Sequence, residues 1–378
     1  VMAFSMDEAG DVWVGTLGQG LDRLDRTTGS FTHYRHDASD PGSLSDDRVL
    51  ALAHDDEGTL WVGTQAQGLD RLGPGAESFA HYRADPEDPE ALASNAIMAL
   101  LPDAGGDLWV GTWGGGLHRL DATTGRFARY RHDPSNAASL ADDRAGSLAE
   151  DAQGRLWIGT QGGGLNRLDP ETGEITRFRH DPENDASLPN DTVLTVHVDG
   201  RGTLWVGTAG DGLARLPDTS VDPSEAEFGR ITTRRGLPNN YINGIREDAA
   251  GQIWVSTNRG LAKLDPVTRE IEVFGRVDGL QSDEFNVGAH YASPGGELVF
   301  GGFEGFNIFD ALQIEGRAYS PPLVLTELSL GNREIELSRH GGEGLAVEFG
   351  PGDPALSLAF AALDFAAPER NRYAYRLE

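Results

Sequence analysis

The sequence contains no cysteine, comparatively few basic residues and no long apolar run. Without cysteine, disulfide bonds and thiolate metal sites are excluded. The 60 Asp and Glu residues outnumber the 31 Lys and Arg residues, which gives a formal net charge of −29. Because this charge repels nucleic acid phosphates and anionic lipid, we expect no nucleic acid partner. No apolar run approaches the roughly 18 residues of a membrane span, and the first residues lack the basic start of a signal peptide.

Glycine, by contrast, is abundant, with 50 residues, and it recurs at regular places. The stretch DLWVGTWGGGLHRLD (107–121) has three consecutive glycines, but neither a lysine nor a helix signal follows, so it is not a phosphate-binding loop. Six tryptophans share its motif at steps of 48 residues, or 49 at the last step: Trp13, Trp61, Trp109, Trp157, Trp205 and Trp254. A seventh copy at 297–310 has Val299 in place of tryptophan. This period predicts the blades of a β-propeller.

Each repeat is expected to form four short strands, which we call A to D. In the third repeat these are residues 96–103, 107–112, 116–121 and 126–133. Asp-x-x-Gly joins A to B and Asp-x-x-Thr-Gly joins C to D; the Asp side chain can bond to backbone amides and Gly adopts the positive φ that closes the turn. B strands such as LWVGT are apolar on both faces, so neighbouring sheets must cover them.

Seven such units predict an all-β protein with a seven-bladed β-propeller at residues 1–318. No window keeps the 3.6-residue period of a helical solenoid. A linear β-solenoid is an alternative, but a closed ring is preferred because closure removes exposed sheet edges. The seventh repeat has no clear strand D. We therefore expect a three-stranded seventh blade, or one completed by residues 311–318.

Residues 319–378 show period-2 alternation without a helix signal, which predicts an immunoglobulin-like β-sandwich. The stretch PPLVLTELSLGNREIEL indicates two strands with a Gly-Asn hairpin. The stretch ALSLAFAALDFAAPERNRYAYRLE indicates two more strands joined by a proline-rich turn. About 60 residues are too few for a sandwich of roughly 100 residues, so we expect this domain to be truncated.

The repeat LWVGTxGGGLxRLD…TGxFxxYRHDP…SLxDD resembles the two-component regulator propeller repeat. The C-terminal stretch is similar to the start of the triple-tyrosine domain that follows such propellers, with Tyr373 and Tyr375 at its first two tyrosines. The resemblance implies the periplasmic sensing region of a bacterial receptor, with a membrane helix and a histidine kinase or diguanylate cyclase output outside this chain. No output motif is present, so we expect no enzymatic activity here. A second ring before Val1 is also compatible with the resemblance.

A small-molecule or carbohydrate ligand is expected on the propeller face where the D–A and B–C loops converge. Loop positions that are free of packing demands are suited to ligand specificity. The candidates near the axis are Arg48, Asn95, Arg144, Asp191, Tyr241 and Asn286, and those outside them are Trp113 and Arg259. Exposed Trp113 suits a sugar face, and the two axial arginines could hold an anion bidentately. The alternative is that these residues satisfy turns or face solvent.

No metal or cofactor is expected. The recurring histidines of the RHD motif, His36, His132 and His180, belong to different blades, whereas zinc needs ligands within about 2 Å. The acidic loops lack the calcium-loop spacing with a terminal bidentate Glu. We therefore expect structural or solvent roles for these histidines.

Two other functions remain open at this stage. A catalytic propeller resembling streptogramin lyase would use His and a divalent metal at the ring centre, and His197 and His290 are the candidates, without a carboxylate constellation beside them. A protein-interaction propeller of the WD-repeat kind is the third. The attached sandwich fragment favours the sensor. A homodimer through the full-length receptor is compatible with the sequence, and membrane attachment would use segments outside this chain.

Overall fold

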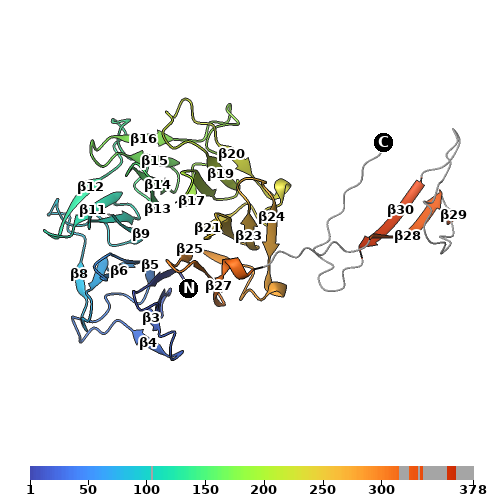
Figure 1. Cartoon of the computed structure of the whole chain (residues 1–378). Coiled ribbons are helices and arrows are strands. Elements are labelled where there is room, and N and C mark those ends of the chain that lie inside the picture. Colours follow the sequence, from blue (N-terminus) through green and yellow to red (C-terminus); the bar gives the residue numbers. More distant parts are fainter. Residues whose placement is uncertain (104, 315–322, 331–332, 335–355, 363–378) are drawn as a thin grey trace. The chain divides into compact units, whose positions relative to one another are not determined.

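The computed structural model describes residues 1–103, 105–314, 323–330, 333–334 and 356–362. The chain forms two compact units, Val1–Ile314 and Glu315–Glu378. Seven antiparallel sheets of the first unit surround a common axis (Figure 1). The fold-class prediction of an all-β, seven-bladed propeller is confirmed.

Six blades have four strands in the order A, B, C, D. The first three blades consist of β1 (Ala3–Met6), β2 (Val12–Gly15), β3 (Leu21–Leu24) and β4 (Phe31–Tyr34); β5 (Val49–His54), β6 (Leu60–Thr64), β7 (Leu69–Leu72) and β8 (Ala80–Tyr82); and β9 (Ile97–Pro102), β10 (Leu108–Thr112), β11 (Leu117–Asp121) and β12 (Arg126–Tyr130). The next three consist of β13 (Ala145–Glu150), β14 (Leu156–Thr160), β15 (Leu165–Leu168) and β16 (Ile175–Phe178); β17 (Val193–Val198), β18 (Leu204–Thr208), β19 (Leu213–Leu216) and β20 (Gly229–Ile231); and β21 (Ile242–Glu247), β22 (Ile253–Thr257), β23 (Gly260–Leu264) and β24 (Ile271–Phe274).

The seventh blade is a three-stranded sheet of β25 (Phe285–Ala292), β26 (Glu297–Gly302) and β27 (Gly305–Asp310). Three strands were the first of the two expectations for this blade, and this is the form observed. Residues Ala311–Gln313 form a short 3-10 helix, η3, rather than a strand, and residues 315–318 lie outside the described part. Two other 3-10 turns, η1 (Thr233–Arg235) and η2 (Arg276–Asp278), precede strands A of the last two blades.

The ring closes between the first and seventh blades. The inner strands contact one another in sequence around the axis, and β1 contacts β25. Val1 N donates to Gly302 O at 3.0 Å, and the rings of Phe4 and Phe306 meet at 5.3 Å. Closure therefore joins the two ends of the repeat array through side-chain packing and backbone bonding.

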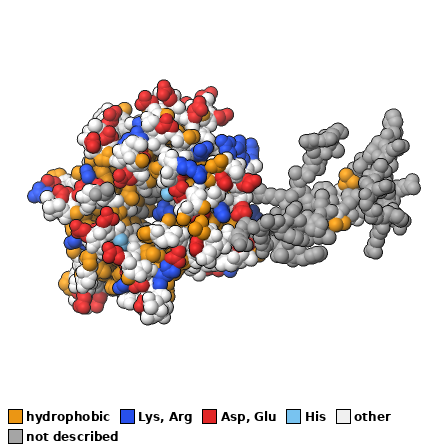
Figure 2. All heavy atoms as spheres, viewed as in Figure 1, with side chains coloured by type: hydrophobic (Ala, Val, Ile, Leu, Met, Phe, Trp, Pro, Cys, Tyr) orange, Lys and Arg blue, Asp and Glu red, His pale blue; other side chains and the backbone are white. Residues whose placement is uncertain are grey.

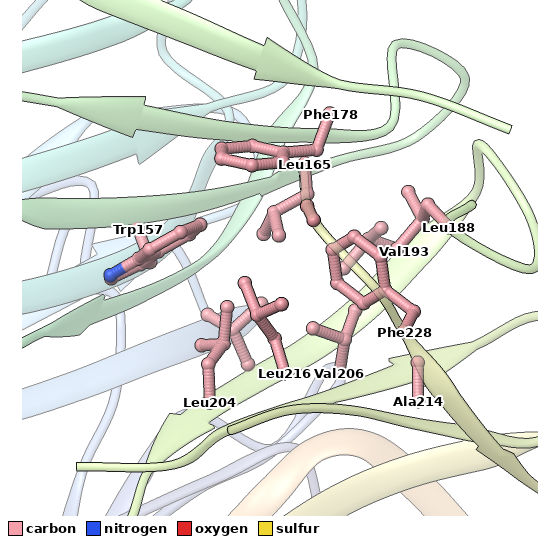
Figure 3. Close-up of a cluster of buried hydrophobic side chains, with 12 residues drawn as sticks. Trp157, Leu165, Phe178, Leu188, Val193, Leu204, Val206, Ala214, Leu216 and Phe228 are labelled. Carbon is pink, nitrogen blue, oxygen red and sulfur yellow. The ribbon is translucent and has the colours of Figure 1, made fainter. Parts of the chain in front are cut away.

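The repeated tryptophans fill the spaces between blades. Trp157, for example, packs against Leu204 and Val206 of the next blade (Figure 3). The six repeat indoles are at most 5% exposed. Burying such aromatic surface on both faces of each sheet explains why single blades depend on their neighbours.

The predicted turn chemistry is also present. Asp199 Oδ1 accepts from the backbone of Thr203 at 2.8 Å, as expected for an Asp that holds the A–B turn. Its Oδ2 also accepts from the indole of Trp205 at 2.8 Å, which the sequence did not predict. The Asp thus ties the turn to the tryptophan that fills the adjacent interface.

In the second unit, β28 (Leu323–Leu330) pairs with β29 (Arg333–Glu334) and β30 (Leu356–Ala362) in the order β29-β28-β30. The predicted pairing of 323–330 with the strand after the Gly-Asn turn is observed. The other predicted strand at the C-terminus, with Tyr373 and Tyr375, lies outside the described residues.

Candidate functional site

The B–C loops and the D–A loops lie side by side on one face of the ring. Residues that follow strand B form isolated bridges with residues that precede the next strand A, as Leu17 does with Arg48, and Trp113 with Arg144. The preceding loop residue caps each strand: Asp142 Oδ1 accepts from Arg144 N at 2.8 Å, and Asn239 Oδ1 accepts from Tyr241 N at 2.7 Å. Side chains at these positions are therefore displayed on a rigid backbone.

Trp113 and Arg144 are the two candidates that the structure brings into contact. The Arg144 guanidinium lies over the Trp113 ring at 5.8 Å from its centroid. Asp142 fixes the guanidinium with bonds of 2.8 Å to Nε and 2.6 Å to Nη2. This pairing lowers the pKa of Asp142 and raises that of Arg144. The indole remains 45% exposed. The result is a fixed aromatic surface beside a charged planar group.

Arg48 makes the same bidentate pair with Asp46, at 3.0 and 2.9 Å. Its bridge partner is Leu17 rather than an aromatic residue. A cavity of about 370 Å³ adjoins it, lined in part by His36, Ser45 and Gln67. Arg48 therefore presents a guanidinium as Arg144 does, but has no aromatic side chain as its bridge partner.

Asn95 and Asp191 hold the repeat's backbone. Asn95 Oδ1 accepts from Ala84 N at 2.7 Å, and Asp191 Oδ1 accepts from His180 N at 2.8 Å. Asp191 also pairs with Arg179 at 2.9 Å. These bonds occupy much of the hydrogen-bonding capacity that a ligand would need.

The remaining candidates are dispersed. Tyr241 is partly buried and bridges to Ala209. Arg259 is exposed and has no ion pair among the described residues. Asn286 donates to Val1 O at 2.8 Å and so helps to close the ring. Within the described ranges, no hydrogen bond, ion pair or ring contact joins these three side chains to Trp113 or Arg144.

The RHD histidines have structural bonds. Nδ1 of His36, His132 and His180 lies 2.9, 2.7 and 2.9 Å from a leucine carbonyl eight residues later. Among the described residues there is no group of three or more His, Cys, Asp or Glu side chains that could hold a metal ion. The repeated histidines thus stabilise the loop between strand D and the next strand A.

A second concave site lies on the axis. The inner strands enclose a channel of about 270 Å³, and Figure 2 shows a hollow near the middle of the ring. The second, third and fourth blades contribute mainly apolar side chains, including Leu52, Met98 and Leu100. The other side carries Arg246 and His290. The wall is therefore mainly apolar on one side, where His54 and Ser147 also lie, and basic on the other.

His197 and His290, the candidates for a lyase, lie close to Arg246 in this region. Burial first, and then the Arg246 charge, lowers the pKa of His197 to about 3 and that of His290 well below its usual value. Burial lowers the pKa of Arg246 to about 10. At neutral pH both histidines are consequently uncharged and the guanidinium is charged. No carboxylate forms a hydrogen bond or ion pair with any of the three within the described ranges.

Sequence reasoning missed Arg246, although the repeat alignment carries a signal for it. Arg246 faces Trp254 across the A–B pair, where Ala53, Leu101 and Ala149 face the tryptophans of the second to fourth blades. An arginine at a position that is small or apolar in the second to fourth blades departs from the packing pattern of those blades. Comparing residues at one repeat position could have found it.

In the described part of the chain, no helix is long and apolar enough to cross a bilayer. Five segments match the family model of the two component regulator propeller: residues 43–66, 91–114, 139–162, 187–210 and 236–259. Each spans a D–A loop and the two inner strands that follow it.

The chain is similar to a histidine kinase of Formosa agariphila, with 28% identity over 151 residues, which are 38% of this chain and 11% of that protein. Among solved structures it is similar to the extracellular domain of a protein named as a hybrid two component system from B. thetaiotaomicron, with a TM-score of 0.72, 24% identity and coverage of 97% of this chain and 47% of that chain. Virginiamycin B lyase from Staphylococcus aureus shares the propeller fold, with a TM-score of 0.60, 18% identity and coverage of 79% and 90%. The chain thus spans about a tenth of the curated relative and about half of the first solved one. The chain is a seven-bladed β-propeller in which five segments match the two component regulator propeller repeat.

Proposed function

We propose that this chain is the periplasmic ligand-sensing region of a bacterial signal-transduction receptor. In this proposal a small molecule or oligosaccharide binds on the propeller face, and a histidine kinase or diguanylate cyclase output lies in other parts of the protein. The repeat match and the likeness to a two component system's extracellular domain support it. The net charge of −29 is consistent with a ligand other than nucleic acid.

The Trp113–Arg144 pair is the observation that carries this proposal. The six repeat tryptophans are buried as spacers, whereas Trp113 lies off the repeat register and is 45% exposed. A ligand that covers the exposed indole removes its apolar surface from water, which favours binding. The flat face of the indole suits a sugar ring, and Arg144 next to it supplies donors in a fixed orientation. Binding through this pair needs little ordering of side chains, since Asp142 already holds Arg144.

The test is a thermal-shift screen of mono- and oligosaccharides, followed by titration calorimetry of the best compound. A ligand that binds the folded state raises its stability by RT ln(1 + [L]/Kd). We expect Trp113→Ala to weaken binding by about 30-fold or more, the effect of removing a central aromatic contact. The matched control is Leu17→Ala, because Leu17 occupies the same repeat position in the first blade and is 59% exposed. If both variants bind like the parent chain, the face is not the binding site.

A further inference from the structure

The axial channel is lined by a cationic side chain, Arg246, which is not part of the proposed ligand site at Trp113. At the strand-A position opposite the tryptophans, blades two to four carry small or apolar residues, whereas blades five and six carry His197 and Arg246. In the seventh blade Tyr291 occupies this position, opposite Val299. Arg246 and Tyr291 line the channel together with His290. His197, Arg246 and His290 thus come from the inner strands of three consecutive blades.

Arg246 lacks a carboxylate partner of the kind that Arg155 has. Arg155, for comparison, pairs with Asp151 at 2.9 Å. Arg246 donates only to two backbone carbonyl oxygens, of Ile245 at 3.2 Å and of His290 at 3.4 Å, and pairs with no carboxylate of the described residues. Arg246 is half-buried, and partial removal of a guanidinium from water without an anion is costly, so such groups are normally paired.

Two further polar atoms near Arg246 are unsatisfied. The buried His197 Nε2 and His290 Nδ1 have no hydrogen-bond partner among the described residues. His290 Nε2 reaches only Thr195 Oγ1, at 3.5 Å. It lies against Gly244, where a Cβ would approach its ring to 2.1 Å, so the sixth blade leaves room for this imidazole. Buried polar atoms without partners indicate a site that a ligand or solvent completes.

We propose that the axial channel is a binding site for a small organic carboxylate, whose carboxylate group pairs with Arg246 and whose apolar part packs against Leu52, Met98 and Leu100. The planar guanidinium matches a carboxylate with two parallel hydrogen bonds. A volume of about 270 Å³ lies just below the roughly 300–1,000 Å³ of drug-sized pockets, which limits the ligand to a small molecule.

The charge balance selects a monoanion over phosphate. Arg246 is the one charged basic group among the described residues that line the channel, because burial lowers the pKa of His54 and of His290, as it does for the neighbouring His197, and leaves these imidazoles neutral at pH 7. The net charge of −29 adds repulsion that a dianion feels more strongly. The apolar side of the channel also favours a ligand with a hydrocarbon part over an inorganic ion.

The channel site is independent of the proposed binding at Trp113. Benzoate, butyrate, sodium phosphate and sodium chloride are the probes, and binding is measured by thermal shift and calorimetry. Benzoate and butyrate are expected to raise the unfolding temperature, with phosphate and chloride giving no rise at equal ionic strength. Arg246→Met is expected to weaken benzoate binding by about 30-fold or more, as when one partner of a buried ion pair is removed. Arg246→Lys, which keeps the charge but loses the planar fork, is expected to give a smaller loss.

Trp113→Ala serves as the control that separates the two sites, and it should bind benzoate like the parent chain. In buffer without carboxylates, Arg246→Met should unfold at the same or a higher temperature than the parent, because an unpaired charge has been removed. Equal stabilisation of the Arg246→Met chain by benzoate would overturn the proposal. So would equal effects of phosphate or chloride, or no effect of either carboxylate on the parent chain. If Arg246→Met fails to fold, unweakened benzoate binding by Arg246→Lys would overturn the bidentate pairing on its own.

Discussion

The same side-chain contacts recur from blade to blade and stabilise this ring. The A–B turn Asp bonds at once to the turn backbone and to the indole, as Asp199 does with Thr203 and Trp205. The third blade departs from this pattern: Asp103 Oδ2 accepts from Arg119 instead, at 3.0 Å. This natural variation supplies a control for measuring what the Asp–Trp bond contributes.

Asp199→Ala is expected to lower the free energy of unfolding by about 2–4 kcal/mol, because a buried indole donor and backbone amides lose a charged acceptor. Urea denaturation of the variant and the parent measures the difference. Asp103→Ala removes the turn bonds and the partly exposed ion pair with Arg119 but no indole bond, so its loss should be smaller. Equal losses would mean that the indole bond contributes no more than this ion pair.

We expect His118 to make the stability of the ring depend on pH. It is fully buried on strand C, and burial lowers its pKa to about 4. Between pH 6.5 and about 4 the unfolded chain binds a proton at this residue that the folded chain does not, so stability falls as the pH falls. At pH 5 the loss from this one residue is about 2 kcal/mol relative to neutral pH.

His118→Asn should remove this part of the acid sensitivity. His118 Nε2 accepts from Ala93 N at 3.0 Å, and Asn166 at the same position of the fourth blade makes the equivalent bond to Ala141 N at 2.9 Å. The variant keeps an acceptor but cannot titrate. Urea denaturation at pH 7 and pH 5 should show a smaller loss for the variant than for the parent chain. A loss of the same size in both would exclude His118 as its source.

At the scale of the element, the B–C hairpin is the unit that recurs most faithfully. Its threonine bonds to the carbonyl of the glycine that starts strand C, as Thr112 Oγ1 does with Gly116 O at 2.8 Å. Gly116 has φ +83°, and a Cβ there would lie 2.3 Å from Tyr130 O of strand D. The last of the three consecutive glycines is therefore required by both conformation and space.

Gly116→Ala should cost more stability than Gly114→Ala. Both residues have positive φ, +83° and +84°, so both variants bear the strain of roughly 1–2 kcal/mol that an L side chain meets in this region. A Cβ at Gly114 meets nothing within 4 Å, whereas one at Gly116 clashes with backbone. Thermal denaturation of the two variants gives the comparison. A larger loss in Gly114→Ala would contradict this account of the hairpin.

The blades could be predicted because their causes are local and repeated. The regular spacing of the six tryptophans from Trp13 to Trp254 specifies the interfaces between blades. The recurring Asp and Gly turns specify where the strands begin and end. The candidate site was harder to predict, because the residues that distinguish one blade from another do not follow the repeat pattern. Asn95 was chosen as a ligand candidate, although side chains at its repeat position bond to the backbone instead. Asn95 accepts from Ala84 N, and the equivalent Asp143 accepts from His132 N. Arg246 was missed because its lack of a partner is a three-dimensional property.

At the scale of the whole molecule, ring closure creates the axial channel. Its wall includes residues of the first and the seventh blades, so the channel exists only if these two blades pack together. Besides the backbone bond of Val1, Arg26 makes a bidentate ion pair across this junction with Glu297, at 2.5 and 2.8 Å. Residues 271 positions apart in the sequence are thereby brought into contact.

Cross-linking across this junction tests the closed ring most directly, and the absence of native cysteine makes it specific. The double variant Arg26→Cys and Glu297→Cys is treated with a short bismaleimide, and the products are identified by mass spectrometry. A closed ring predicts an efficient cross-link within one chain. Arg26→Cys with Glu183→Cys, which joins the first blade to the loop after the fourth, should give none. Reaction of the first pair only between chains, or equal reaction of both pairs, would contradict the closed ring.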